Sequence, residues 1–140
     1  MAIAFHELVP VSVKDKRKLK SFIYTLFKKE GRLLNSMDII FCSDDYLLEI
    51  NKQHLQHDFY TDIITFDLSD VKNGSIMAEL YISIDRVKEN ALFIKTSFSN
   101  ELHRVIFHGA LHLCGYGDKG KKDIVLMRGK EDEYLESYFN

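Results

Sequence analysis

Residues 75–84 read Ser-Ile-Met-Ala-Glu-Leu-Tyr-Ile-Ser-Ile, and an apolar side chain occupies every second position of this run. Successive side chains of a β-strand point to opposite faces, so one face of this run is apolar and the other is mixed. Residues 63–66, Ile-Ile-Thr-Phe, read as a second strand, and the turn-forming residues Lys-Asn-Gly at 72–74 lie between the two runs. The two runs therefore predict a β-hairpin.

Further strands and helices flank this hairpin. Residues 2–13 and 38–42 read as strands, the first of them an edge strand that ends near Pro10. The apolar spacing predicts helices over residues 15–30, 85–95, 99–114 and 122–138, and a short helix after the capping residues 43–45. Residues 51–60 show no apolar period and read as a loop. In the helices predicted for 85–95 and 122–138, the positions expected to face inward are Val87, Ala91, Leu92, Ile94, Ile124, Met127, Leu135 and Tyr138.

These elements predict an α+β fold. We expect one domain over residues 1–140, with a small mixed sheet of about four strands packed by about five helices. The chain has 46% hydrophobic and 29% charged residues and a single proline, which is typical of an ordinary folded protein. Its formal net charge of −2 gives no general attraction to nucleic acid, so any such contact depends on a local patch.

Neither a leader nor a membrane span is indicated by the sequence. The N-terminus lacks a basic region followed by an apolar run, and no window approaches the ~18 apolar residues that a span needs. Cys42 and Cys114 are too few and too isolated for a disulfide framework. We therefore expect a cytoplasmic protein without membrane contact.

His108 and His112 stand four residues apart in the helix predicted for 99–114, which places both imidazoles on one face, one turn apart. Two neutral imidazoles held this way are a ready pair of metal ligands. Gly115 stands where a glycine can end the helix in a left-handed conformation, and Asp118 stands where the returning chain can bring a third ligand. A lone histidine beside an apolar stripe is most often structural, whereas this combination favours a metal site.

Two imidazoles and one carboxylate suit Zn²⁺, although nickel, manganese and iron also fit. Three protein ligands leave one position for a water molecule whose pKa the metal lowers toward ~7, so such a site is hydrolytic by default. The spacing H-x-x-x-H-x-x-G-x-x-D is also that of the zincin-like metzincin peptidases, with aspartate as the third ligand. Those peptidases carry a glutamate base directly after the first histidine, where this chain has Gly109. A peptidase of that type would therefore lack its general base.

The same stretch resembles the signature of the YbeY family of single-strand-specific metallo-endoribonucleases, H-G-x-L-H-x-x-G-Y-D-H. The matching positions are His108, Gly109, Leu111, His112, Gly115 and Tyr116. Residues 61–66, Thr-Asp-Ile-Ile-Thr-Phe, resemble the family's T-D-V-L-S-F strand, and residues 78–80 stand where the family has G-D-I. The resemblance implies a metal-dependent endoribonuclease of ribosomal RNA processing that matures the 3′ end of 16S RNA, serves ribosome quality control and meets the small ribosomal subunit.

Two positions depart from the family pattern. Asp118 stands where the family usually has a histidine ligand, and Asp123 is the alternative third ligand. Leu55 stands where the family usually has an arginine that is thought to meet substrate phosphate. The cations expected to bind substrate in its place are His57, Arg104, Lys119, Lys121 and Lys122. The three lysines are equally well interpreted as an ordinary solvated loop.

The predicted catalytic residues, His108, His112 and Asp118, act through the metal. Asp62 and Glu101 are expected behind the ligands, where they orient a histidine, a role worth ~10–100-fold in metal affinity. No residue stands out as a general base. Two alternative functions remain open, a peptidase-like zinc hydrolase and a non-catalytic ribosome-assembly factor with a structural metal.

Overall fold

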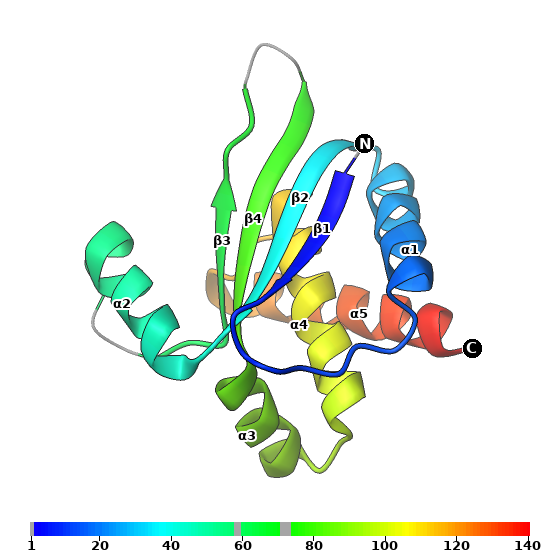
Figure 1. Ribbon diagram of the computed structural model, residues 1–140. Coiled ribbons are helices and arrows are strands. Elements are labelled where there is room, and N and C mark those ends of the chain that lie inside the picture. The colour runs from blue at the N-terminus through cyan, green and yellow to red at the C-terminus, as the bar shows by residue number, and fades with distance from the viewer. Residues whose placement is uncertain (1, 58–59, 71–73) are drawn as a thin grey trace.

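The computed structural model describes residues 2–57, 60–70 and 74–140 (Figure 1). Its elements are, in order, β1 (Ala2–Glu7), α1 (Lys16–Lys29), β2 (Leu33–Cys42), α2 (Asp44–Leu55), β3 (Ile63–Asp67), β4 (Ser75–Ser83), α3 (Ile84–Ile94), α4 (Phe98–Leu113) and α5 (Gly120–Phe139). The strands form one sheet in the order β1-β2-β4-β3, in which β1, β2 and β4 are parallel and β3 is antiparallel to β4. The predicted α+β class, with a mixed sheet of four strands and five helices, is confirmed.

The hairpin of β3 and β4 lies where the alternating sequence predicts it. Leu80 and Ile82 are fully buried on one face of β4, whereas Met77 is 44% exposed on the other. Ile64 of β3 pairs with Tyr81 of β4. The predicted turn at 72–74 falls mainly on residues that lie outside the described ranges.

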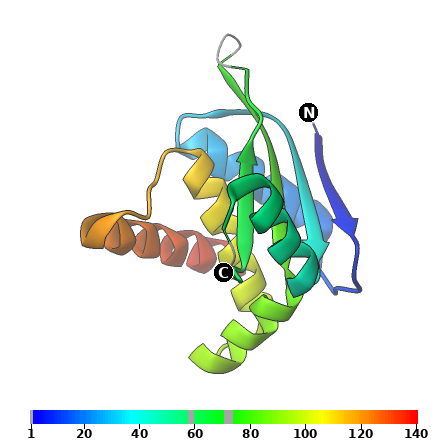
Figure 2. The same cartoon turned by 90° about the vertical axis from the view of Figure 1, so that its left-hand side faces the viewer.

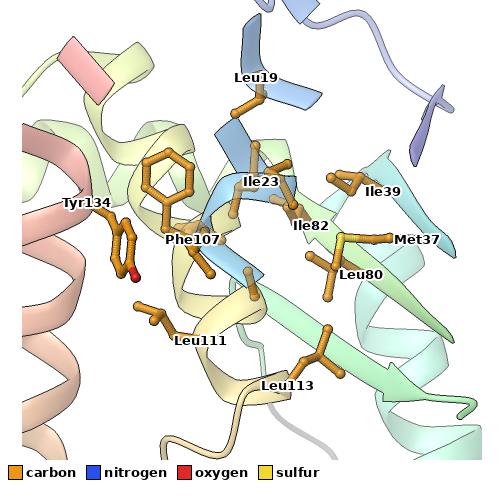
Figure 3. Packing of buried hydrophobic residues seen from close by; sticks show 14 of the residues in the cluster. Leu19, Ile23, Met37, Ile39, Leu80, Ile82, Phe107, Leu111, Leu113 and Tyr134 are labelled. Atoms are coloured by element: carbon orange, nitrogen blue, oxygen red, sulfur yellow. The ribbon is translucent and has the colours of Figure 1, made fainter. Parts of the chain in front are cut away.

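The two faces of the sheet carry different helices (Figures 1 and 2). The main core lies between the sheet and the helices α1, α4 and α5; it includes Leu19, Ile23, Ile39, Leu80, Ile82, Phe107, Leu111 and Tyr134 (Figure 3). A smaller cluster of Cys42, Leu47 and Ile64 places α2 on the opposite face, beside β3. In the described part of the chain, no helix is both long and apolar enough to cross a membrane.

Several boundaries differ from the sequence prediction. Strand β2 begins at Leu33, before the predicted 38–42, because its first half, Leu-Leu-Asn-Ser-Met, also pairs with β4, across a bulge between Leu34 and Ser36. Helix α2 continues to Leu55 through the segment predicted as a loop; only Leu47 and Asn51 of this helix are buried, so its apolar period is weak.

Some positions predicted to face inward are exposed. Leu92 and Ile94 are 82% and 49% exposed, whereas Ala91 in the same turn of α3 is buried, so these two side chains lie on the solvent side of the helix. Ile124, in the first turns of α5, is 53% exposed. The predicted inner positions Val87, Ala91, Met127, Leu135 and Tyr138 are buried, as expected.

Candidate metal centre

Helix α4, which packs on the same face of the sheet as α1 and α5, carries the histidine pair. Its N-cap, Ser97, accepts a hydrogen bond from the Asn100 backbone N–H, and Glu101 adds a negative charge to the first turn, where the helix dipole favours it. The helix ends as predicted, with Gly115 at a φ of 109° and its N–H donating to the His112 carbonyl. Both histidines flank the buried stripe, with the His108 side chain 33% exposed and His112 exposed.

The His112 ring is held by the turn that follows its own helix. Its Nδ1 lies 3.2 Å from the Tyr116 carbonyl oxygen. A carbonyl can only accept, so Nδ1 carries the hydrogen of this bond. In the neutral ring the lone pair then lies on Nε2, which is the nitrogen available to a metal.

The His108 ring is held by a carboxylate from α5. Its Nδ1 lies 2.7 Å from Glu131 Oε2, and Glu131 is 4% exposed. The hydrogen bond to Glu131 raises the pKa of His108, and burial opposes this shift. Burial acts to raise the pKa of Glu131, but its bonds from His108 and Arg104 outweigh burial and hold that pKa below its ordinary value. Glu131 is therefore an ionised acceptor, and Nε2 of a neutral His108 is the nitrogen left for a metal.

Arg104 fixes the Glu131 carboxylate. Its Nη1 donates to Glu131 Oε1 at 3.0 Å, and its Nη2 donates to Asp132 at 2.8 Å. Arg104 is one turn before His108 on α4, so one guanidinium and one imidazole of the same helix face share one carboxylate of α5. The pair Glu131 and Arg104 thus ties α4, which carries the histidine pair, to the C-terminal helix α5.

Sequence reasoning missed Glu131. The signal was present, because Glu131 follows Met127 by one turn and precedes Leu135 by one turn, and both neighbours are buried. A carboxylate in an apolar stripe is almost never buried without a partner. Its position therefore indicated a cation or an N–H donor on the facing helix.

Two cavities meet at the histidine pair, and both are lined by His108, Ile63 and Asp118. The first, which we call the α4–α5 cavity, has a volume of about 190 Å³ and is lined by Asp62, Ile63, Glu101, Arg104, Val105, His108, Asp118, Ile124, Met127, Arg128 and Glu131. The second, which we call the α2–β3 cavity, has a volume of about 390 Å³ and is lined by Asn51, Leu55, His57, Thr61, Ile63, Ile64, Thr65, His108, His112 and Asp118. The histidine pair therefore lies at a junction that substrate can approach from two sides.

The donor chemistry at this junction fits a transition metal. Two imidazoles offer Nε2, and the Asp118 carboxylate lines both cavities beside His108. Within residues 2–57, 60–70 and 74–140, however, no three His, Cys, Asp or Glu side chains lie close enough together to hold a metal ion. Asp118 itself is exposed in the segment that precedes α5.

Four other predicted residues lie in or beside the two cavities. His57 lines the α2–β3 cavity, next to Leu55. Asp62 lines the α4–α5 cavity, and burial raises its pKa although the charge of His108 opposes that shift. Glu101 Oε1 lies 3.8 Å from Arg104 Nε, so Glu101 faces Arg104 while Glu131 meets His108. Arg104 itself is engaged by carboxylates.

Four predicted residues that follow Asp118 lie outside both cavity linings. Lys119, Lys121 and Lys122 are exposed at the start of α5. Asp123 packs against Gly117, where an added Cβ would lie 2.9 Å from Asp123 Oδ2. None of these four is among the described residues that line either cavity. Asp118 thus lines both cavities together with His108, whereas the alternative ligand Asp123 lines neither.

Gly109 lies where α4 touches the sheet. A Cβ built on Gly109 would lie 2.8 Å from Ile63 Cδ1 and 3.1 Å from Leu80 Cδ1. The glycine therefore permits the close approach of the helix to β3 and β4. With glycine at this position, the chain lacks the glutamate that is the general base of the metzincin peptidases.

Comparison with known proteins points to one family. The sequence model of a family described as "Endoribonuclease YbeY" matches residues 7–139. Similar curated proteins carry the same name: one of Cytophaga hutchinsonii is 47% identical over 131 residues, covering 94% of this chain and 91% of its own. Another, of Flavobacterium psychrophilum, is 42% identical over 136 residues, covering 97% and 96%.

A solved structure is similar as well. The solution structure of TM1509 from Thermotoga maritima superposes with a TM-score of 0.64 at 30% identity, covering 99% of this chain and 89% of that one. The similarity extends over all the elements that carry the histidine pair and the two cavities.

Proposed function

The chain belongs to the YbeY family of endoribonucleases, and from this premise we propose that it cleaves single-stranded RNA in ribosomal RNA processing. The observation that carries the proposal is the pair of imidazoles on one face of α4, each with Nδ1 on an acceptor. Residues 1–140 act as one catalytic domain in the cytoplasm. The substrate is the 3′ end of 16S RNA, and the partner is the small ribosomal subunit.

The metal that best suits this donor set is Zn²⁺, held by His108, His112 and Asp118. When bound, such an ion polarises a phosphoryl oxygen and lowers the pKa of a bound water. Glu131 orients His108 and keeps its Nδ1 protonated, and the Tyr116 carbonyl does the same for His112. Asp62 acts through its charge on His108.

The α2–β3 cavity is the proposed path of the RNA backbone. His57 lines it and offers a donor to phosphate near the place where Leu55 replaces the family arginine. Lys119, Lys121 and Lys122 are exposed beside the site and attract the chain of phosphates from a distance. Arg104 holds the Glu131 carboxylate that orients His108. A cavity of about 390 Å³ admits a splayed single strand and has no room for a duplex.

The peptidase alternative is disfavoured by Gly109, because this residue stands where those peptidases carry their glutamate base. A non-catalytic assembly factor differs from the proposal in a single property, the ability to cut RNA. The two are therefore separated by a cleavage experiment.

The test uses purified protein, zinc and a defined RNA offered as a single strand and as a duplex. We expect cleavage of the single strand, and a loss of at least about 100-fold for His108→Ala and His112→Ala. His6→Ala, at an exposed histidine on β1, serves as the control. Equal cleavage by the parent and both variants would remove the metal-site mechanism, and absence of cleavage by the parent would favour the assembly factor.

A further inference from the structure

The α4–α5 cavity contains two buried polar atoms that the site described above does not use. Glu101 is 5% exposed, and its Oε1 has no hydrogen-bond partner among the described residues. Arg104 Nε is likewise buried without a hydrogen-bond partner there. Both side chains line the cavity, and the two atoms lie 3.8 Å apart, too far for a hydrogen bond to each other.

Buried polar atoms are costly unless a ligand or water satisfies them. Glu101 Oε1 is an acceptor, and Arg104 Nε–H is a donor. Side by side, they match a ligand edge with an N–H group next to an acceptor atom. Each nucleobase carries such an edge on its Watson–Crick side, and unpaired bases of a single strand leave that edge free.

The charge of the cavity selects among ligands. Its lining includes the carboxylates of Asp62, Glu101, Asp118 and Glu131, against the guanidinium groups of Arg104 and Arg128 and the imidazole of His108. An excess of acceptors disfavours a phosphate and favours a neutral group with N–H donors. The apolar walls, Ile63, Val105, Ile124 and Met127, suit the flat faces of a ring.

We propose that the α4–α5 cavity is a nucleobase subsite, in which one base of the bound RNA enters edge first. Glu101 Oε1 accepts a hydrogen bond from an N–H group of the Watson–Crick edge, and Arg104 Nε–H donates to the acceptor atom beside that group. The donor and acceptor are N6–H and N1 in adenine, N4–H and N3 in cytosine, N1–H and O6 in guanine, and N3–H and O4 in uracil. The volume of about 190 Å³ far exceeds the ~30 Å³ that one water occupies in the liquid. The proposal rests on the proposed function, because it supposes that RNA passes the histidine pair.

The two cavities share His108 and Asp118, so a base in one and the backbone in the other would place the intervening phosphate beside the histidines. The subsite would therefore choose which phosphodiester reaches the metal ligands. It would also reject a duplex, in which the same base edge is already paired.

The experiment measures binding and cleavage of a short single-stranded RNA with one known cleavage position. In one series each nucleotide in turn is replaced by an abasic ribose; in a second series the critical nucleotide is A, C, G or U. Binding is followed by fluorescence anisotropy with chelator present, which makes this measurement independent of the metal. We expect one abasic position to weaken binding about 10-fold, and each of the four bases at that position to bind more tightly than the abasic ribose.

Glu101→Gln is the decisive variant because it keeps the side-chain shape and removes the charge. It is expected to lose about 10-fold in affinity for the intact RNA and nothing for the abasic RNA. The matched control is Glu133→Gln, at an exposed position of α5. Since Glu101 is buried, a second pair guards against misfolding: Ile124→Ala at the cavity wall weakens binding of the intact RNA, and its exposed neighbour Val125→Ala leaves it unchanged.

The outcomes separate this proposal from the proposed function. RNA that is cut by the parent but bound equally well with and without each base overturns the base subsite alone. Equal losses by Glu101→Gln on intact and abasic RNA also overturn it, because they indicate a structural role. A parent that neither binds nor cuts RNA overturns the proposed function, and the base subsite with it.

Discussion

His108 Nδ1 lies 2.7 Å from Glu131 Oε2, so a carboxylate of the C-terminal helix sets the orientation of a proposed metal ligand on α4. The bond joins residues that are 23 positions apart in the chain. Metal-binding histidines commonly donate their second N–H to such an acceptor, which fixes the ring and makes it more basic. The geometry at His108 follows this pattern.

Glu131→Gln is therefore expected to weaken zinc binding. The amide keeps the shape of the side chain but is a poorer acceptor than the carboxylate, and we expect a loss of about 10-fold in affinity. Competition between the protein and a chromophoric chelator measures it. Glu133→Gln on the same helix is the control, because its side chain is 63% exposed. Indistinguishable zinc affinities of the two variants would contradict the orienting role.

Arg104→Met tests whether this arginine is structural. The change leaves Glu131, whose side chain is 6% exposed, without its shortest guanidinium partner, and unpaired buried charges are strongly destabilising. We expect the free energy of unfolding to fall by about 3 kcal/mol.

Arg128→Met is the comparison for Arg104→Met. The Arg128 side chain is 61% exposed and lies 3.6 Å from the same Glu131 oxygen, so its loss is expected to cost less than about 1 kcal/mol. Urea denaturation of the two variants measures both values. Equal stability of the two variants would show that the ion pair of Arg104 with Glu131 contributes no more than the exposed pair of Arg128.

The sequence predicted the ligand helix better than the residues that support it. His108, His112 and Gly115 lie within about two helical turns, so periodicity and the glycine turn were enough to place them. Glu131 meets His108 only after α5 folds back across α4, and no local pattern records which residues of two helices face each other. Arg104 was predicted to bind substrate because an arginine near a phosphate site is a natural donor; its ion pairs depend on the same long-range packing. Leu92 and Ile124 show the converse, since an apolar residue in register does not guarantee that another element covers it.

Gly109→Ala is expected to destabilise the protein although alanine is the better helix former. The new Cβ would lie 2.8 Å from Ile63 Cδ1, so the side chains of the sheet must shift. Overpacking of this kind costs about 1–3 kcal/mol, and the better helix propensity of alanine recovers about 1 kcal/mol. We therefore expect the free energy of unfolding to fall by up to about 2 kcal/mol.

Gly129→Ala is the matched control, because an added Cβ there meets nothing within 4 Å. Without a clash, only the propensity term remains, and the variant is expected to gain about 0.5–1 kcal/mol. Thermal unfolding of both variants gives the comparison. A gain in stability for Gly109→Ala as large as that for Gly129→Ala would show that α4 is free to move from the sheet.

His103 is expected to make the fold sensitive to acid. It is 2% exposed, stacks on Tyr138 and has its Nδ1 2.6 Å from the Ser99 carbonyl oxygen. Burial lowers the pKa of His103, and the bond to Ser99 opposes this only in part. Below the ordinary pKa of about 6.5 the unfolded chain binds a proton that the folded chain resists, so this contribution to stability is complete above that pH and falls with acid.

His103→Phe removes the titrating group and keeps a ring in the aromatic cluster. Urea unfolding at pH 7.5 and pH 5.5 gives the loss of stability on acidification for parent and variant. The parent is expected to lose more, with a difference of at most about 1.4 kcal/mol per pH unit. An equal loss in both proteins would mean that His103 takes up its proton as readily in the folded chain as in the unfolded one.

Leu55→Arg is expected to improve RNA binding. Leu55 is 41% exposed and lines the α2–β3 cavity together with His57, His108 and His112, so an arginine there can reach a phosphate without burying its charge. A charge-assisted hydrogen bond contributes about 1.5 kcal/mol, or roughly a 10-fold gain in affinity, and one more phosphate contact steepens the salt dependence of binding. Fluorescence anisotropy over a range of salt concentrations measures both effects. Gln53→Arg, at an exposed position of the same helix outside this cavity, adds the same charge and is expected to give a much smaller gain. Equal gains from the two substitutions would indicate general attraction between charges and would remove the α2–β3 cavity as the path of the backbone.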